Sequence, residues 1–302
     1  MIGILISTFE RYAKIAHFTK QEIKKQWVGH PPLFFSGLLE QGERYLSFKS
    51  DSRDWMGVTL EAVMEMRDRG LTHAYLILDD HPPVGPCHDR FLNDVLPALA
   101  RKLEAVYIGL LGYGQHRNVN GIVLGKENGF LEQCAPSYLW KFSLHPGLWN
   151  LEALEVILKQ RHAAYGKGGR TAWNFERYED LCEDALLQAF SSRCFRVCGS
   201  AFLQEPTTMK HQIRQEAIRR FFIDVSLFVT KTTHGLDSRK TLEKKLLWHF
   251  GHYLGPYPLF WSGLMQQGKA HHGFTQWLKA YGSKELQEGY KNLTSQDAQL
   301  LQ

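Results

Sequence analysis

Two acids and a histidine follow a short apolar run in residues 74–83. The run 74–78 has the length and composition of a buried strand, and two prolines stop the strand from continuing beyond Asp79, Asp80 and His81. In open α/β sheets, ligands bind outside the carboxyl ends of the strands. The stretch therefore predicts either charged side chains placed for binding and catalysis or an ordinary Asp-Pro turn.

A second polar stretch follows the first apolar run of the chain, residues 2–7. The segment 7–11 contains Ser, Thr, Glu and Arg, and residues 12–27 then have the pattern of a helix. A strand, a polar turn and a helix open a nucleotide-binding unit, because backbone amides and hydroxyls at such a turn can hold a nucleotide. The turn lacks the Gly-x-Gly-x-x-Gly pattern, which argues against a dinucleotide site.

Further strands and helices must position these residues. Asp51 or Ser52 is expected to cap the helix 56–69. A glycine-rich stretch, 112–137, predicts a functional lid or a small hairpin, and residues 145–150 are expected to turn. Strands are expected at 33–36, 45–48, 106–111, 138–144 and 195–202, and helices at 56–69, 91–103, 151–161, from about 178 to 191, and through 209–250.

Composition limits the class of protein. A chain of 302 residues can bury a large core, and 44% hydrophobic with 22% charged residues is typical of a soluble globular protein. The formal net charge of +5 is mild, and acids and bases are interspersed. Nucleic acid is therefore not expected to be the main partner.

The expected location is cytoplasmic. The five cysteines are odd in number and mostly far apart, which predicts reduced thiols in a cytosolic protein. The apolar start, 1–7, is too short for a secretion signal and lacks a charged region before it. Three lysines of the basic segment 209–250 form either a solvated helix face or a peripheral contact with an anionic membrane surface: Lys240, Lys244 and Lys245.

Three motifs together resemble those of nucleotide-sugar-dependent glycosyltransferases of the GT-A fold, particularly bacterial cell-surface polysaccharide enzymes. The motifs lie at 76–81, 142–150 and 172–176, and a weaker similarity lies in the Gly-Lys pair at 268–269. The resemblance implies an α/β fold with a Rossmann-like central mixed sheet flanked by helices. Residues 1–178 would form the nucleotide-sugar-binding core, and a mainly helical portion, 179–302, would complete the acceptor side.

The resemblance also implies a divalent metal, Mn²⁺ or Mg²⁺. The metal motif of the family is Asp-x-Asp, and its third position is His81 if counting starts at Asp79, or Asp80 if it starts at Leu78. Asp80 would bind an ion that bridges the two donor phosphates, with Asp79 on the ribose or on a metal-bound water. His81 is the alternative ligand, since Mn²⁺ accepts both carboxylate and imidazole.

Other residues receive roles from the same resemblance. Glu176 is either the general base that deprotonates the acceptor hydroxyl or a helix cap. Thr8, Arg11 and Asp51 would lie near the base and ribose of the donor. Lys269 would neutralise the diphosphate from the C-terminal side.

Three aromatic residues in the motifs have two interpretations each. Trp149 and Trp173 either stack on sugar faces or belong to the core. His145 either approaches the donor sugar or forms a His-Pro turn.

The expected function is transfer of a sugar, of the hexosyltransferase type, from a nucleoside diphosphate donor to a hydroxyl of a glycan or glycolipid acceptor. Inversion and retention both stay open. One alternative is a nucleotidyltransferase that makes a sugar nucleotide, although residues 7–11 lack the glycine-rich, basic triphosphate loop of such enzymes. The other is a catalytically silent protein that binds nucleotides.

Overall fold

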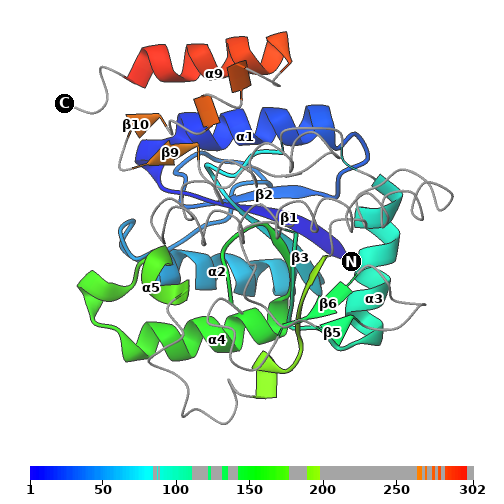
Figure 1. Cartoon of the computed structure of the whole chain (residues 1–302). Coiled ribbons are helices and arrows are strands. Elements are labelled where there is room, and N and C mark those ends of the chain that lie inside the picture. The colour runs from blue at the N-terminus through cyan, green and yellow to red at the C-terminus, as the bar shows by residue number, and fades with distance from the viewer. Residues whose placement is uncertain are drawn as a thin grey trace, which may run out of the picture.

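The structure is a computed structural model, and it describes residues 1–83, 87, 89–110, 122–123, 131–134, 142–176, 189–197, 264–266, 269–270, 274–275, 278–279 and 283–297. In this part of the chain, helices cover both faces of a mixed β-sheet (Figure 1). The expected α/β architecture, with a central mixed sheet flanked by helices, is therefore confirmed.

The sheet contains eight strands among the described residues, in the order β2-β1-β3-β7-β4-β8-β6-β5. Strand β1 is parallel to both β2 and β3, while β7 runs antiparallel between β3 and β4. A separate antiparallel pair joins β9 (Met265–Gln266) to β10 (Lys269–Ala270). The strands of the main sheet are β1 (Ile2–Ser7), β2 (Leu33–Ser36), β3 (His73–Leu78), β4 (Tyr107–Gly109), β5 (Ile122–Val123), β6 (Leu131–Gln133), β7 (Gly147–Asn150) and β8 (Cys194–Val197).

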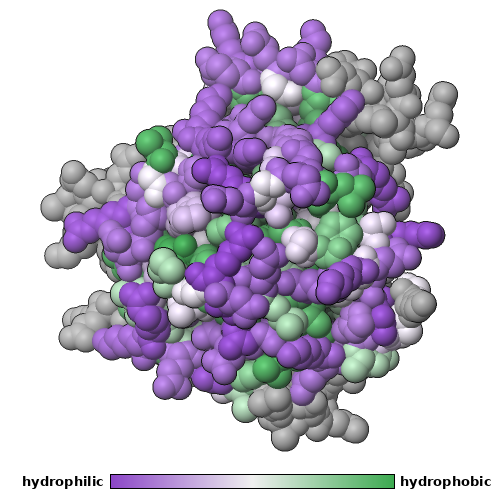
Figure 2. Space-filling model, turned by 180° about the vertical axis from the view of Figure 1, so that it is seen from behind, coloured by the Kyte–Doolittle hydropathy of each residue, from purple (hydrophilic) through white to green (hydrophobic). Residues whose placement is uncertain are grey.

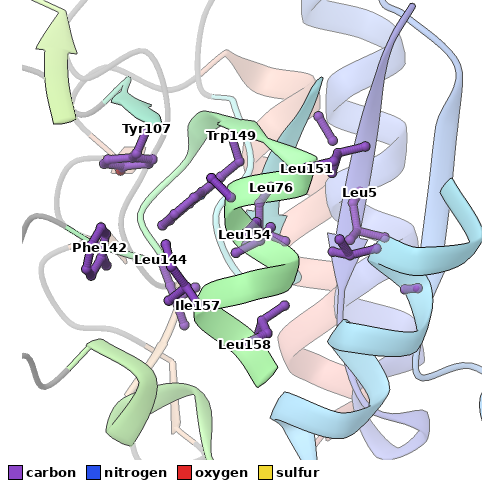
Figure 3. Close-up of a cluster of buried hydrophobic side chains, with 14 of the residues drawn as sticks. Leu5, Leu76, Tyr107, Phe142, Leu144, Trp149, Leu151, Leu154, Ile157 and Leu158 are labelled. Carbon is purple, nitrogen blue, oxygen red and sulfur yellow. The ribbon is translucent and has the colours of Figure 1, made fainter. Parts of the chain in front are cut away.

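The central strands are apolar on both faces because helices cover both sides of the sheet. Ile4 and Ile6 of β1 face a cluster with α1 (Ala13–Gln26) and α3 (Leu96–Lys102). Leu5, between them, faces the opposite cluster with α2 (Trp55–Asp68) and α4 (Leu151–Ala164). Figure 3 shows side chains from β1, β3, β7 and α4 meeting in this second cluster. A continuous apolar run is thus the expected pattern for these strands.

Short helical turns complete the described core. A 3₁₀ turn, η1 (Glu10–Tyr12), leads into α1, and a π-helical turn, η2 (Phe91–Val95), leads into α3. Another 3₁₀ turn, η4 (Lys167–Gly169), precedes α5 (Ala172–Glu176).

The C-terminal helix α9 (Lys284–Asp297) packs on the outer side of α1 (Figure 1). Its residues Leu286, Tyr290 and Leu293 follow the spacing of one helix face and join Ile15 and Phe18 of α1 in a third apolar cluster. The face of the molecule in Figure 2 is mostly hydrophilic, with small separate hydrophobic patches. Within the described residues, no helix has both the length and the apolar character needed to cross a membrane.

Near α2, the structure differs from the sequence prediction in one strand and in one helix cap. The strand expected at 45–48 is reduced to a single bridge between Phe35 and Tyr45, because the amides of Ser47 and Lys49 bond to glutamates of α2 instead of a strand. Neither Asp51 nor Ser52 caps α2. Asp54 is the cap, since its carboxylate accepts the N–H of Gly57 at 2.8 Å.

Two predictions around β7 were also wrong. Residues 147–150 form a strand and not a turn, because β3 and β4 offer hydrogen bonds on both sides. Gly147 allows the fit, since a Cβ there would lie 2.2 Å from the Tyr107 ring. Residues 142–144, expected in a strand, are not in one; the N–H of Leu144 binds Glu176 instead.

Several predicted features fall on residues outside those that the structure describes. These are most of the loop 112–137, residues 138–141 of a predicted strand, the end of the strand 195–202, most of the helix expected from about 178 to 191, the helix expected through 209–250, and the domain boundary near residue 178.

His73 at the start of β3 makes stability depend on pH. Its side chain is buried, which lowers its pKa to about 4, and Arg101 and the N-terminal amine act in the same direction. Below its unfolded pKa of about 6.5, the unfolded state binds a proton that the folded state does not. As the pH falls from 6.5 to 4, we expect the titration of His73 to lower the free energy of unfolding by up to about 3 kcal/mol. Urea unfolding of His73→Gln will show a smaller loss over this range; an unchanged pH dependence would contradict the assignment.

Candidate functional site

The candidate site lies where β1 and β3 end side by side. Their parallel register pairs Ser7 with Leu78, so the next residues, Thr8 and Asp79, leave the sheet together. The hydroxyl of Thr8 donates to Oδ2 of Asp79 at 2.6 Å. Gly37, at the end of β2, has φ of +81° and lies so close to the Thr8 carbonyl that a Cβ would be 2.0 Å away. Three strand ends therefore meet at Thr8.

Asp79 and Asp80 occupy the corner of a tight turn. The N–H of His81 donates to the carbonyl of Leu78 at 3.0 Å, as in a β-turn with the two acids at its centre. The hydroxyl of Thr19 donates to the carbonyl of Asp79. The turn expected from the prolines thus exists, and it also presents both carboxyl groups at the carboxyl edge of the sheet.

The turn is also connected to the C-terminal segment. The N–H of Leu264 donates to the carbonyl of Asp80 at 2.8 Å, and the hydroxyl of Tyr290 on α9 donates to the carbonyl of Leu264 at 3.3 Å. Leu264 also belongs to the third apolar cluster. Residues almost two hundred positions apart therefore fix the same turn.

Asp80 and His81 form a close pair. Nδ1 of His81 lies 3.1 Å from Oδ1 of Asp80, yet makes no well-aligned hydrogen bond in the described structure. The imidazole is buried and its ring meets that of His145 at a centroid distance of 5.5 Å, almost perpendicular. The Asp80 side chain keeps 23% of its surface exposed, so a ligand can reach it.

Glu176 approaches the same edge from α5. Its Oε1 accepts the N–H of Leu144 at 2.6 Å and the hydroxyl of Ser143 at 3.2 Å. The capping role considered for Glu176 belongs instead to Thr171, whose Oγ1 accepts the N–H of Asn174 at 3.2 Å. Glu176 is therefore held by the loop that precedes β7.

Polar contacts hold the segment that carries Glu176. Asp54, the cap of α2, also accepts Nε2 of His162 at 2.9 Å and Nη1 of Arg170 at 3.1 Å. Arg170 in turn accepts the N–H of Met56 on its carbonyl at 3.2 Å. The start of α2 and the segment before α5 are thus joined, which fixes the entry to α5.

The pKa values of Asp79 and Glu176 are raised at this site. Burial and, next to it, the charge of the neighbouring Asp80 together raise the pKa of Asp79 to about 7, although the hydrogen bond from Thr8 opposes this shift. Burial also raises the pKa of Glu176, although the bonds from Leu144 and Ser143 oppose it. Burial would lower the pKa of His81, but the acidic neighbours, led by Asp80, raise it overall. A positive ligand would relieve this concentration of acids.

The residues at this turn could hold a divalent cation. No group of three or more His, Cys, Asp or Glu side chains arranged for a metal ion occurs among the described residues. Mg²⁺ often takes only one or two protein carboxylates and completes its coordination with phosphate oxygens and water. Asp80 would supply one such carboxylate, whereas the buried Nδ1 of His81, which has no aligned hydrogen bond in the described structure, would add a ligand only for a cation that accepts imidazole, such as Mn²⁺.

The structure brings together most, but not all, of the predicted site residues. Thr8, Asp79, Asp80 and His81 gather at one turn, and Glu176, at the end of α5, is close enough for its charge to act on His81. Three residues lie apart from these contacts and their donor-binding roles stay predictions: Arg11, Asp51 and Lys269.

Those three residues have other surroundings. Arg11 is exposed, with its guanidinium 4.6 Å from the ring centroid of Tyr12. Asp51 lies in an exposed turn and accepts the N–H of Arg53 at 2.8 Å. Lys269 begins β10, and its side chain lies outside the described residues.

The two tryptophans of the motifs differ. Trp149 is fully buried between the Tyr107 and Phe142 rings, so the stacking interpretation for it was wrong. Trp173 is 59% exposed. A strand between two others buries its side chains on both faces, which accounts for Trp149.

Sequence reasoning missed several residues that shape the site. Thr19 and Leu264 both bond to the backbone of the acidic turn. Thr19 is a single polar residue on a helix and Leu264 an apolar residue far along the chain, so no sequence pattern indicated these contacts. Ser143 lies within a recognised motif, and its Ser-Leu-His context gave the only hint of a partner for Glu176. Comparisons of the chain with protein families, curated proteins and solved structures found no match.

Proposed function

We propose that the protein is a glycosyltransferase of the GT-A type, which transfers a sugar from a nucleoside diphosphate donor to a hydroxyl of a glycan or glycolipid. The observation that carries the proposal is the turn with Asp79 and Asp80 at the ends of adjacent parallel strands, with Glu176 close to it. The nucleotide-type opening of the chain supplies Thr8 to the same turn. Ligands of α/β sheets bind at this edge.

The acidic turn is the proposed diphosphate end of the site. Asp80 and His81 would hold Mn²⁺ or Mg²⁺, and the bound ion would offset the charge that develops on the departing nucleoside diphosphate. Asp79 is held by Thr8 and Thr19, so it keeps the turn in shape, and it would contact the ribose of the donor or a metal-bound water. Without a cation, two carboxylates at this turn would repel a diphosphate.

Glu176 is the proposed general base. The hydrogen bonds from Leu144 and Ser143 both reach Oε1 of its carboxylate, so these two residues orient the group before an acceptor arrives. Its raised pKa makes the carboxylate a stronger proton acceptor near neutral pH. It would take the proton of the acceptor hydroxyl as that oxygen attacks the sugar.

The partners of this reaction follow from the proposal. They are a nucleoside diphosphate sugar and a hydroxyl-bearing glycan or glycolipid, with no role for nucleic acid. A glycolipid acceptor would require access to a membrane surface from the cytoplasm. The basic segment considered for that contact, 209–250, lies outside the described residues.

Thermal unfolding with nucleoside diphosphates tests the proposal. We expect one of UDP, GDP, CDP, ADP or dTDP to raise the melting temperature in the presence of Mn²⁺ and much less in its absence. A ligand at a hundredfold excess over its Kd adds about 2.7 kcal/mol to stability. No stabilisation by any of the five, with or without Mn²⁺, would contradict the proposal.

Two follow-up assays separate the alternative functions. Release of the diphosphate from the sugar donor when acceptor is added identifies a transferase, and binding with no release from any donor identifies a silent binding protein. Stabilisation that requires a nucleoside triphosphate with a sugar phosphate would instead indicate a nucleotidyltransferase.

A further inference from the structure

A cavity of about 670 Å³ opens at the edge of the sheet where β3 begins, opposite the edge that carries the acidic turn. Its walls come from the end of α2, the start of β3, the end of α3 and the start of α4. The volume lies within the range of about 300–1,000 Å³ that is typical of small-molecule sites. The residues around it include Leu71, His73, Arg101, Asn150, Glu152 and Glu155. The cavity therefore lies apart from the residues that carry the proposed function.

The imidazole of His73 is a buried hydrogen-bond acceptor in the wall of this cavity. The Thr72 hydroxyl donates to the carbonyl of Met1 at 3.2 Å, so its oxygen accepts a hydrogen bond from Nδ1 of His73, 3.0 Å away. Burial lowers the pKa of His73 to about 4, which keeps the ring neutral near pH 7. The ring hydrogen is therefore on Nδ1, and Nε2 carries a lone pair without a hydrogen-bond partner among the described residues. A ligand at Nε2 must donate to it.

Asn150 and Arg101 supply hydrogen-bond donors next to this acceptor. Asn150 is the register partner of His73 in the antiparallel pair of β3 and β7, and side chains directly opposite each other lie about 4.5–5.5 Å apart at Cβ. Its Oδ1 caps α4 by accepting the N–H of Ala153 at 3.0 Å, so the NH₂ of its amide is the group that can donate to a ligand. The charge of Arg101 helps to lower the pKa of His73, which places the guanidinium near the ring. A ligand carboxylate can accept from both residues.

The cavity also contains unpaired charges of both signs. Arg101 and Glu152 line it, and neither forms an ion pair with a residue that the structure describes. Glu155, by contrast, is bound by both Arg67 and Lys159. Glu152 lies in the first turn of α4, where the helix dipole favours the ionised carboxylate. A cation alone would be repelled by Arg101 and an anion alone by Glu152, whereas a ligand with both charges can pair with each of them.

We propose that this cavity binds a free amino acid in its zwitterionic form. The ammonium group would lie between the Glu152 carboxylate and Nε2 of His73. The carboxylate of the ligand would accept hydrogen bonds from Arg101 and from the amide of Asn150. Leu71, which also lines the cavity, offers an apolar surface to the side chain of the ligand. This site is separate from the acidic turn, and it does not rest on the proposed function.

Saturation-transfer NMR on the full chain tests the site with three probes of nearly equal size. L-leucine carries both charges, L-leucinamide carries only the ammonium, and N-acetyl-L-leucine carries only the carboxylate. We expect transfer to L-leucine, with an apparent affinity about tenfold higher than that of either analogue, because each analogue loses a charge-assisted hydrogen bond. Absence of binding by L-leucine, or equal binding of the three probes, would overturn the proposal. So would preferential binding of one analogue, since the cavity would then hold an ion of one sign.

Variants of the two unpaired residues locate the binding. Arg101→Ala and Glu152→Gln should each lower the apparent affinity for L-leucine about tenfold. Both side chains are exposed, so the fold should survive either change. Lys102→Ala is the matched control, because it removes a positive charge from the same end of α3 but from a residue that does not line the cavity. Its affinity should equal that of wild type. Wild-type affinity in both Arg101→Ala and Glu152→Gln would place the amino acid elsewhere and overturn the site.

Nitrogen NMR of histidine-labelled protein tests the role of His73 directly. The Nε2 resonance of His73, assigned by its loss in His73→Gln, should have the shift of an unprotonated nitrogen and should move when L-leucine is added. It should not move when L-leucine is added to Glu152→Gln at a concentration that fills the wild-type site. A protonated Nε2 in the free protein, or a resonance that ignores bound L-leucine, would overturn the assignment of His73 to the ammonium group.

Discussion

Replacing Asp80 by Ala will abolish the Mn²⁺-dependent stabilisation by nucleoside diphosphate and reduce sugar transfer by on the order of a thousandfold. Asp80 is the more accessible of the two proposed metal ligands, since its side chain is 23% exposed and that of His81 only 8%. The backbone of the turn should survive the substitution, because its carbonyl still accepts the N–H of Leu264. Mn²⁺ titrations followed by thermal shift, and rates of diphosphate release, measure the two effects.

Two further variants sharpen this prediction. Asp68→Ala removes an exposed carboxylate from the C-terminal end of α2, far from the turn, and should change neither measurement. His81→Ala should weaken Mn²⁺ binding less than Asp80→Ala does. If His81→Ala abolishes the Mn²⁺ effect and Asp80→Ala preserves it, the imidazole is the main ligand. If neither variant changes the Mn²⁺ effect, the ion binds elsewhere.

Glu176→Gln should lower sugar transfer by about 10²–10⁴-fold while nucleoside diphosphate binding stays unchanged. The amide oxygen of Gln can still accept the N–H of Leu144 and the hydroxyl of Ser143, so the loop before β7 should keep its shape. What the variant loses is the carboxylate that accepts a proton. Steady-state rates with donor and acceptor measure the loss, and thermal shift with diphosphate and Mn²⁺ measures donor binding.

The pH profile of transfer separates a base from a structural residue. Burial raises the pKa of Glu176, and a base works only when it is deprotonated. The rate in wild type should therefore fall as the pH decreases through this raised pKa, and that acidic limb should be absent in Glu176→Gln. Ser143→Ala, which removes one bond to the carboxylate, should shift the limb to higher pH. A Gln variant with nearly wild-type rates would place the base on another residue.

The centre of the sheet could be predicted because burial on both faces leaves a plain signal. β1, β2 and β3 are apolar runs of strand length, and the polar residues that follow β1 and β3 meet at the expected edge. The position of Asp79 and Thr8 follows directly from the register of two parallel strands. This part of the site depends on neighbouring strands whose ends the sequence marks with prolines and polar residues.

The other features of the fold and of the candidate site depend on contacts that leave no pattern in the local sequence. β7 was missed because Pro146 and Gly147 are ordinary turn signals, whereas pairing with strands on both sides stabilises the extended conformation. The partners of Glu176 come from a loop, and loop conformations follow from specific hydrogen bonds more than from periodicity. The bond from Leu264 to Asp80 joins distant segments, which no short motif can specify.

The third apolar cluster shares no residue with the two clusters that flank the sheet. Structural units with separate cores can unfold locally at a lower free energy than the whole domain. Opening of the unit that contains α9 would break the bond from Leu264 to Asp80 while the sheet stays folded. Any ligand that needs the ordered turn would therefore stabilise the packing of α9, and loosening of α9 would weaken the binding of that ligand by the same free energy.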